Sequence, residues 1–588
     1  MDTMESSDIQ YGDPIELAPK ILHRFYEPIM LLEALGGSVR EQSPIPSQSM
    51  RVDVEDPQEL YQAFVYKLAH LCDREKGGKT VTSIMILNTS NALTDEQDLT
   101  YVFGVNQATS RHLEHTASFL GTVLQKVAIA PPVTDVEGRT AAERELRQIV
   151  LRFNRPRVRF YLRSLKERAG VCLTQCLNQD TEEDQEVAKG LQELLDSPHD
   201  FIDTEMTPEA EYDQKCKTVF RKLANIFSSK RLNDILLNRA AAGRSAIQGY
   251  TSMACWSDLV HTALRILAYR ASVHYCFLAR DQWPQLFQTR PHIVAIPSGD
   301  LRDTPRRNKS LQAEGIVGRM TSNPKVMNIF KRFVQDLQMH NLDTRLADAY
   351  KTNTKLAVHS EVLLHHWLLT DRGKGEITPT MFFNSWPYIG SSKPTCKLCK
   401  YYFEESRSGV KVRASHGNLY PKWRLPDVYD CHGEDAVKRR QIMLDRILQR
   451  VRAEVFDVIK KKSPLSYKHE DSNTWSATLQ LDDRWTQNQT DAGTDAGTTV
   501  GTVADWAEDA SVMVHRADVE PAPGVIKDED SIASMDSTDL LETSVDDLQG
   551  YRLHGQVVES DMRTHASMER YEDEDEDDDD DNGGGAAL

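Results

Sequence analysis

Apolar residues recur at intervals of three and four along two stretches near the start of the chain, residues 15–35 and residues 60–71. In a helix this spacing gathers the apolar side chains on one face, which can then pack against the rest of the protein. The pattern therefore predicts a helical N-terminal region over residues 1–75.

The composition of the sequence then changes. Residues 81–87 and 99–105 are rich in β-branched and aromatic side chains, and a polar segment separates them. Two such runs predict a strand hairpin within residues 76–109. Helical spacing returns afterwards, with a short β-rich run at residues 292–296. We expect residues 110–350 to form a mainly helical insertion or domain.

The last third of the chain divides into an ordered and a polar part. A helix is expected over residues 325–342, and residues 435–462 carry apolar side chains at helical spacing up to Pro464. The second pattern predicts a C-terminal helix within residues 431–465. Residues 466–588 are rich in Ser, Thr, Asp, Gly and Gln. Such a segment buries too little apolar area to offset its ordering entropy, so we predict a disordered acidic tail.

Charge is distributed unevenly along the chain. The overall net charge is −19, but residues 471–588 hold 31 acidic and 6 basic residues, including ten consecutive acidic ones at 572–581. The body of the chain is therefore mildly basic, which is compatible with a phosphate-bearing substrate. Seven basic residues within 152–168 predict either a solvated helix face or a phosphate-contacting surface. The acidic tail is a candidate site for protein partners.

The cysteine content and the apolar runs indicate the compartment. Nine cysteines in 588 residues are too few for a disulfide scaffold. The acidic N-terminus lacks the apolar segment of a secretory signal, and no apolar run approaches the roughly 20 residues that span a bilayer. We expect a soluble intracellular protein, in the cytoplasm or the nucleus, without membrane contact.

The candidate chemistry lies between the helical insertion and the C-terminal helix. Cys396-Lys-Leu-Cys399 is the one Cys-x-x-Cys sequence of the chain, and His359-Ser-Glu361 opens an apolar run upstream of it. A β-like run over residues 380–386, followed by a turn region, separates the two motifs. His359 is thus predicted to begin one helix and the cysteines the next, with a strand between them.

Two helix N-termini at one sheet edge would place His359, Cys396 and Cys399 around one metal ion. Three such ligands leave the fourth tetrahedral position to water, as an open catalytic zinc site requires. Zinc lowers the pKa of its water towards about 7. Glu361, two residues from the histidine, is placed to accept the water proton and to return it to the substrate. This is the order of residues in zinc deaminases, whose glutamate is a proton shuttle and binds no metal.

A structural alternative uses the same cysteines. Cys396, Cys399, Cys431 and His432 would complete a closed zinc site with four protein ligands, leaving Glu361 without a role. The chain would then be a catalytically inactive, zinc-stabilised scaffold or interaction protein.

The segment resembles a known family. The residues that carry the resemblance are His359-Ser-Glu361, Cys396-Lys-Leu-Cys399, Ser415-His-Gly417, Tyr420, Trp423 and Pro426. Together they resemble a fungal branch of the nucleic acid/nucleotide deaminase superfamily, named after a bacterial toxin-like prototype. The resemblance covers about 70 of the 588 residues. Better-known deaminases place proline directly before the first cysteine, whereas Thr395 intervenes here. Their substrates therefore transfer poorly to this chain.

The resemblance implies a cytidine-deaminase-like α/β/α core with a mixed sheet, here heavily elaborated by helices, with residues 351–430 as its zinc-binding part. The implied activity is hydrolytic deamination of a nucleobase in a nucleotide or nucleic acid. Zn²⁺ would be held by His359, Cys396 and Cys399, and Glu361 would be the acid and base.

The resemblance also suggests a place for the hairpin. In deaminases, two strands precede the histidine-bearing helix, and the second ends near an asparagine that contacts substrate; Asn106 occupies that position here. In the rival arrangement, the N-terminal part is a separate domain and the core strands come from residues 290–350. Trp386 and Trp423 are candidates for stacking on a base, and His416 for a substrate contact. Packing, or a hydrogen bond within a loop, is the alternative role of each.

Overall fold

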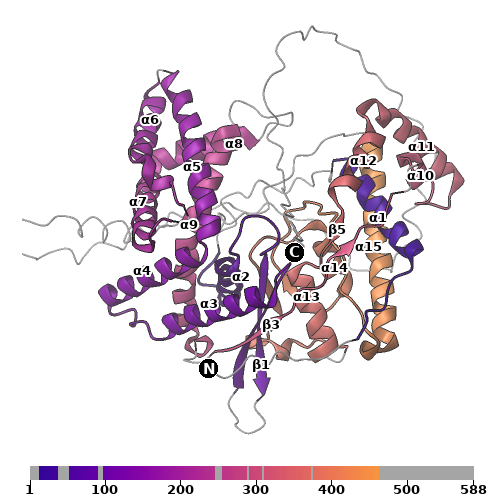
Figure 1. Ribbon diagram of the computed structural model, residues 1–588, viewed down its shortest axis with the longest axis horizontal. Helices are drawn as coiled ribbons and strands as arrows, with labels where there is room; N and C mark the ends of the chain where they lie inside the picture. Colours follow the sequence, from indigo (N-terminus) through magenta and orange to yellow (C-terminus); the bar gives the residue numbers. More distant parts are fainter. Residues whose placement is uncertain are drawn as a thin grey trace, which may run out of the picture. The chain divides into compact units, whose positions relative to one another are not determined.

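The structure is a computed structural model that describes residues 12–36, 52–90, 97–179, 181–204, 206–244, 254–287, 291–307, 310–372 and 375–461 (Figure 1). The predicted acidic tail lies outside these residues. The helices are α1 (Pro19–Ala34), α2 (Pro57–Cys72), α3 (Ser110–Ala128), α4 (Val136–Phe153), α5 (Arg155–Leu177), α6 (Glu182–Leu195), α7 (Glu209–Ser228), α8 (Lys230–Arg244), α9 (Ala254–Gln282), α10 (Ala313–Val317), α11 (Pro324–Leu337), α12 (Leu342–Thr352), α13 (Ser360–Trp367), α14 (Lys397–Ser406) and α15 (Gly433–Lys461). The strands are β1 (Thr82–Ser90), β2 (Gln97–Val105), β3 (His292–Ile296), β4 (Arg302–Asp303), β5 (Lys355–Leu356), β6 (Tyr388–Ser391) and β7 (Lys411–Val412).

A mixed five-stranded sheet, with strand order β3-β2-β1-β6-β7, organises these elements. β1 is antiparallel to both β2 and β6, whereas β3 runs parallel to β2 and β7 runs parallel to β6. The hairpin thus shares one sheet with strands from residues 292–296 and 388–391. The prediction of an α/β fold with a mixed sheet, elaborated by many helices, is confirmed.

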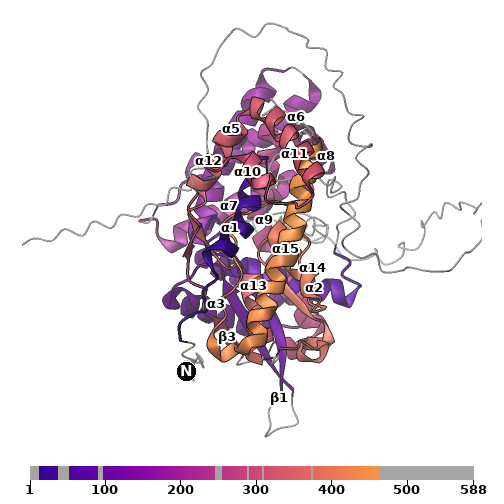
Figure 2. The same cartoon turned by 90° about the vertical axis from the view of Figure 1, so that its right-hand side faces the viewer.

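Alternation along the strands divides the interior into two cores. On β1, Ile84 and Ile86 belong to a core that α2, α3, α5 and α9 complete on one face of the sheet. Met85 and Leu87 belong to the core on the other face, with α1, α13, α14 and α15. Successive side chains of a strand point to opposite faces, so one apolar strand serves both cores. Figure 2 shows α15 beside α1 and α14, with which it is in contact.

The expected strand over residues 380–386 is wrong. Two short 3₁₀ turns, Pro379–Met381 and Phe383–Ser385, occupy this segment, and β6 begins at Tyr388, within the expected turn region. Asn384 and Ser385 have positive φ angles of 51° and 56°, which no strand accommodates. This apolar segment packs as a turn against β1, where Asn88 donates hydrogen bonds to Thr380 O and Phe382 O.

The helix expected over residues 325–342 corresponds to α11, which ends five residues earlier and is followed by the 3₁₀ turn Gln338–His340. α11 ends at Leu337, and α12 begins at Leu342 after Asn341, whose φ is 55°. Asparagine tolerates this left-handed conformation better than most residues, so it is a natural break point. The expected C-terminal helix corresponds to α15.

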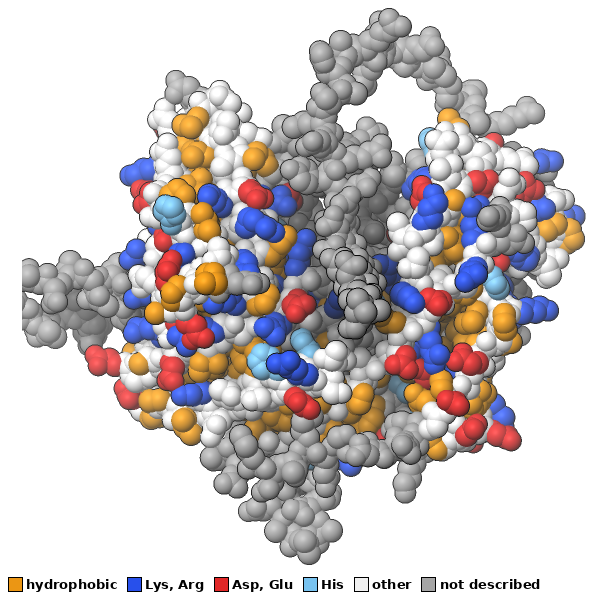
Figure 3. Space-filling view, in the orientation of Figure 1, with side chains coloured by type: hydrophobic (Ala, Val, Ile, Leu, Met, Phe, Trp, Pro, Cys, Tyr) orange, Lys and Arg blue, Asp and Glu red, His pale blue; other side chains and the backbone are white. Residues whose placement is uncertain are grey.

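The basic stretch at residues 152–168 is mostly neutralised within the helical region. Five of its seven basic side chains form ion pairs with described residues: Arg152 with Asp213, Arg155 and Arg159 with Asp203, Arg157 with Asp73, and Arg168 with Asp258. On the face drawn in Figure 3, basic and acidic side chains are interspersed rather than gathered by sign. This pairing favours a structural role for the stretch over a phosphate-contacting surface.

Candidate metal centre

His359 and Cys396 each lie at the N-cap of a helix. His359 has an extended backbone and precedes α13, and Cys396 does the same before α14. The Sγ atom of Cys396 accepts a hydrogen bond from the backbone N–H of Cys399 at 3.5 Å. Unpaired N–H groups at a helix start favour a negatively charged sulfur, so this local geometry favours the thiolate that a metal needs.

The three predicted ligands converge. One side-chain atom each of His359, Cys396 and Cys399 lie within 4.8 Å of one another, and they form the one such group of metal-binding side chains among the described residues. The Nδ1 atom of His359 is 3.5 Å from Cys396 Sγ and 3.3 Å from Cys399 Sγ. Both cysteines are buried, and the histidine is partly buried.

Electrostatic coupling opposes the effect of burial on the pKa of Cys396 and His359, but adds to it at Cys399. Burial alone would raise the pKa of the Cys396 thiol, but the hydrogen bond from Cys399 and the nearby His359 hold that pKa well below its ordinary value. Burial lowers the pKa of His359, yet the Cys396 thiolate raises it above its ordinary value overall. Burial and the Cys396 sulfur raise the pKa of Cys399. The short separations thus favour negative charge on the Cys396 sulfur, and metal binding requires deprotonated ligands.

Glu361 lies beside the ligands without belonging to their group. Its side chain is 4% exposed, and the neighbouring Cys399 thiol contributes to lowering the pKa of its carboxyl. Burial raises the pKa of this carboxyl above its ordinary value, while the charge of His359 lowers it in part. A carboxyl with a raised pKa exchanges protons more readily near neutral pH.

Asn106, at the end of β2, supports the start of α13. Its Oδ1 atom accepts a hydrogen bond from Ser360 N at 2.7 Å, and its Nδ2 group donates to Gly78 O at 2.8 Å. Ser360 Oγ also lies 2.8 Å from Ser83 Oγ on β1. The hairpin therefore holds the residue between His359 and Glu361. Sequence reasoning missed Ser83 and Ser360, since nothing in their spacing marks them.

Trp423 is fully buried at 0% exposure. Its Nε1–H donates to Cys399 Sγ at 3.2 Å, and its ring lies 6.4 Å from that of Phe25 on α1. A side chain without exposed surface offers no face to a base in this conformation, so the geometry favours support of the cysteine sulfur over base stacking. Hydrogen bonds to ligand atoms tune metal sites in this way.

The other two candidates for substrate contact lie in different places. The backbone N–H of His416 donates to Thr395 O, next to Cys396. The His416 ring centroid is 5.7 Å from that of Tyr420, and the Tyr420 ring is 6.3 Å from the His359 ring. Trp386 packs against Tyr61, Trp283 and Phe383 in the core on the opposite face of the sheet from the cysteines. The packing of Trp386 favours a structural role.

The four-ligand alternative does not form among the described residues. Cys431 is exposed, and neither it nor His432 belongs to the group of three ligand atoms. The ring of His432 packs against His366 at 5.8 Å, and its Nδ1 atom accepts a hydrogen bond from Tyr429 N. A donor set of one imidazole and two sulfurs, with a buried carboxylate alongside, fits an open zinc site.

A family model described as OTT_1508-like deaminase matches residues 358–427. This segment belongs to the deaminase superfamily. The deaminase segment begins one residue before His359 and includes Glu361 and both cysteines. Comparison with curated proteins gave no significant match, and neither did comparison with solved structures.

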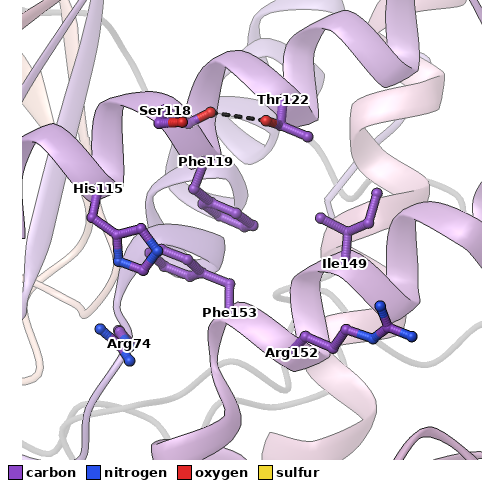
Figure 4. Close-up of a pocket in the computed structure, with 8 residues that line it drawn as sticks. All are labelled: Arg74, His115, Ser118, Phe119, Thr122, Ile149, Arg152 and Phe153. Atoms are coloured by element: carbon purple, nitrogen blue, oxygen red, sulfur yellow. Dashed lines mark hydrogen bonds between the residues drawn. The ribbon is translucent and has the colours of Figure 1, made fainter. Parts of the chain in front are cut away.

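A cavity outside the deaminase segment has a different character. It measures about 340 Å³ and lies at α3 and α4, over the stacked rings of Phe119 and Phe153, whose centroids are 3.7 Å apart (Figure 4). Arg74, His115 and Arg152 also line it, but none of the predicted site residues does.

None of the described helices is long and apolar enough to cross a bilayer.

Proposed function

We propose that the chain is a zinc-dependent deaminase that hydrolyses the exocyclic amino group of a nucleobase, in a nucleotide or nucleic acid, and releases ammonia. The observation that carries this proposal is the convergence of His359, Cys396 and Cys399 within 4.8 Å, with the Glu361 carboxylate buried beside them. The family match of residues 358–427 supports it.

The ligand atoms would be one imidazole nitrogen and two sulfurs. A zinc ion held there supplies Lewis-acid chemistry, which lowers the pKa of water towards about 7. His359 and Cys396 would bring the starts of α13 and α14 to the same ion, because each is the N-cap residue of its helix. Trp423 holds the Cys399 sulfur from the core side.

Glu361 is the proposed proton shuttle. Its carboxylate would accept a proton from the attacking water, deliver it to the ring nitrogen, and take part in protonating the departing amino group. Burial, which raises the pKa of the Glu361 carboxyl, suits a group that must both accept and return a proton. Asn106 is proposed as a positioning residue, because its amide holds Ser360. His416 remains a proposed substrate contact.

The test is an ammonia-release screen of the purified full chain against bases, nucleosides, nucleotides and oligonucleotides. The expected result is release from at least one class, abolished by a chelator and restored by zinc. Stoichiometric zinc without ammonia release from any class would support the alternative of an inactive, zinc-stabilised scaffold.

A further inference from the structure

The cavity at α3 and α4 has an aromatic wall. Phe119 and Phe153 lie face to face, with ring centroids 3.7 Å apart and planes 7° apart. The ring of His115 is 5.0 Å from that of Phe153. The two phenylalanines belong to the core, whereas His115 is exposed. Aromatic surface at a cavity wall favours a planar ring as the ligand.

A guanidinium group stands at one side of this wall. The Arg74 guanidinium carbon is 5.9 Å from the Phe153 ring centroid, and Arg74 Nε is buried without a hydrogen-bond partner among the described residues. A buried donor that lacks an acceptor is costly. An anionic oxygen satisfies a guanidinium better than a neutral one does. Arg74 therefore favours a ligand that carries an anionic group.

The charges around the cavity place this anionic group at the Arg74 side. In Figure 4, Arg74 and His115 lie on one side of the stacked rings, and Arg152 lies on the other. Arg152 is already paired with Asp213 at 2.5 Å. Burial lowers the pKa of His115, and the charges of Arg74 and Arg111 lower it further. The position beside His115 is thus electropositive, which attracts an anion.

The size of the cavity limits the ligand. Its volume of about 340 Å³ lies at the lower end of the range for small-molecule sites. We therefore expect a small molecule with one ring system, and not a polymer segment.

We propose that this cavity binds a small molecule in which a planar aromatic ring carries an anionic group, with the ring against Phe119 and Phe153 and the anion at Arg74. A nucleoside monophosphate and an aromatic carboxylate share this chemistry. The proposal goes beyond the proposed deaminase function and does not depend on it, because none of the predicted site residues lines the cavity.

Calorimetry on the zinc-loaded full chain tests this site. The first probe is inosine monophosphate, whose base lacks an exocyclic amino group and is therefore no substrate for deamination. Inosine and inorganic phosphate supply the two halves of this probe separately. Indole-3-carboxylate represents the aromatic carboxylates, and the tighter of the two aromatic anions identifies the class of the ligand.

Two substitutions address the cavity in different ways. Arg74→Met removes the charge and keeps the length of the side chain. Ser118→Trp fills the cavity from an exposed position of its lining, so it tests the site without removing a core residue. Arg144→Met, at an exposed arginine of α4 outside the lining, is the matched control.

We expect one aromatic anion to bind per chain. Arg74→Met and Ser118→Trp should each weaken this binding at least about 10-fold, and Arg144→Met should leave it unchanged. Inosine and phosphate should each bind at least about 10-fold more weakly than inosine monophosphate. Absence of saturable binding by both aromatic anions up to about 1 mM would overturn the proposal. So would binding that Arg74→Met and Ser118→Trp leave unchanged.

Failure of this proposal and failure of the deaminase are distinguishable. Inosine monophosphate bound at the metal centre would be insensitive to Arg74→Met, which would count against the cavity and leave the deaminase standing. Binding that depends on Arg74, without ammonia release from any substrate class, would contradict the deaminase and leave this cavity site standing.

Discussion

At the scale of single residues, substitution of Trp423 tests whether its indole supports the candidate ligand Cys399 or contacts the substrate. Trp423→Phe keeps the buried ring and removes the Nε1–H that donates to Cys399 Sγ. We expect the protein to fold and zinc affinity to fall by about 10-fold or more, because loss of a hydrogen bond to a ligand typically weakens metal sites to this extent. Competition with a chromogenic chelator measures it. Trp386→Phe, in the other core, is the control and should leave zinc affinity unchanged.

The sequence identifies the three candidate ligands, which the structure brings together, but it does not identify the residues that contact them. Cys396, Cys399 and His359 follow from spacing, since the chemistry restricts both residue type and position at a helix start. Spacing cannot reveal that Trp423 turns inward and donates to Cys399, because an aromatic side chain serves packing and stacking alike. Only the fold brings Asn106 to the N–H of Ser360.

At the scale of elements, a buried ion pair connects the helical region to the loop between β6 and α14, residues 392–396. Asp73 follows α2 and binds Arg157 on α5 and Ser392 on the loop after β6. Asp73→Asn would leave the Arg157 charge buried without its partner, so we expect a loss of about 3–5 kcal/mol in unfolding free energy. Urea unfolding checks this. Arg152→Met, which breaks an exposed pair, should cost less than about 1 kcal/mol. Equal losses in the two variants would refute this role of Asp73.

Helix α13 makes stability depend on pH. Burial, helped by the neighbouring His366, lowers the pKa of His365 to about 3. The folded state therefore keeps His365 neutral, while the unfolded chain takes up a proton below its ordinary pKa of about 6.5. Stability present above that pH is lost as pH falls, by about 2 kcal/mol between pH 7 and pH 5 for this one group. Urea unfolding of wild type and His365→Gln at both pH values, at matched zinc, should show a smaller loss in the variant. An identical loss would rule out this origin.

The apolar pattern predicts some strands correctly and fails for one segment. Residues 81–87 and 99–105 predict β1 and β2 well, because a strand that serves two cores is apolar along its length. The same criterion fails at residues 380–386. There Phe382 and Phe383 are buried although their backbone forms turns. Burial explains why this segment is apolar, whereas its backbone angles determine that it forms turns and no strand.

At the scale of the whole molecule, segments far apart in sequence depend on one another. β1 pairs with β6 across about 300 residues, and α13 packs on β1 and β2. We therefore propose that the hairpin is part of the deaminase core and that the helices of residues 110–287 are inserted into it. A fragment of residues 351–461 should neither fold nor bind zinc tightly, because β6 and α13 lose these partners. Residues 12–461 should do both. Circular dichroism and zinc titration of the two fragments check this, and a folded short fragment would favour the rival arrangement with a separate N-terminal domain.

The most direct test of a catalytic zinc site is Glu361→Gln, with zinc content and ammonia release measured on the same sample. Glu434→Gln is the matched control, since Glu434 also follows a His-x-Glu pattern but faces solvent at the start of α15. We predict that Glu361→Gln keeps one zinc per chain and loses ammonia release by at least about 100-fold, while Glu434→Gln changes neither. Full ammonia release by a zinc-loaded Glu361→Gln variant would contradict the account.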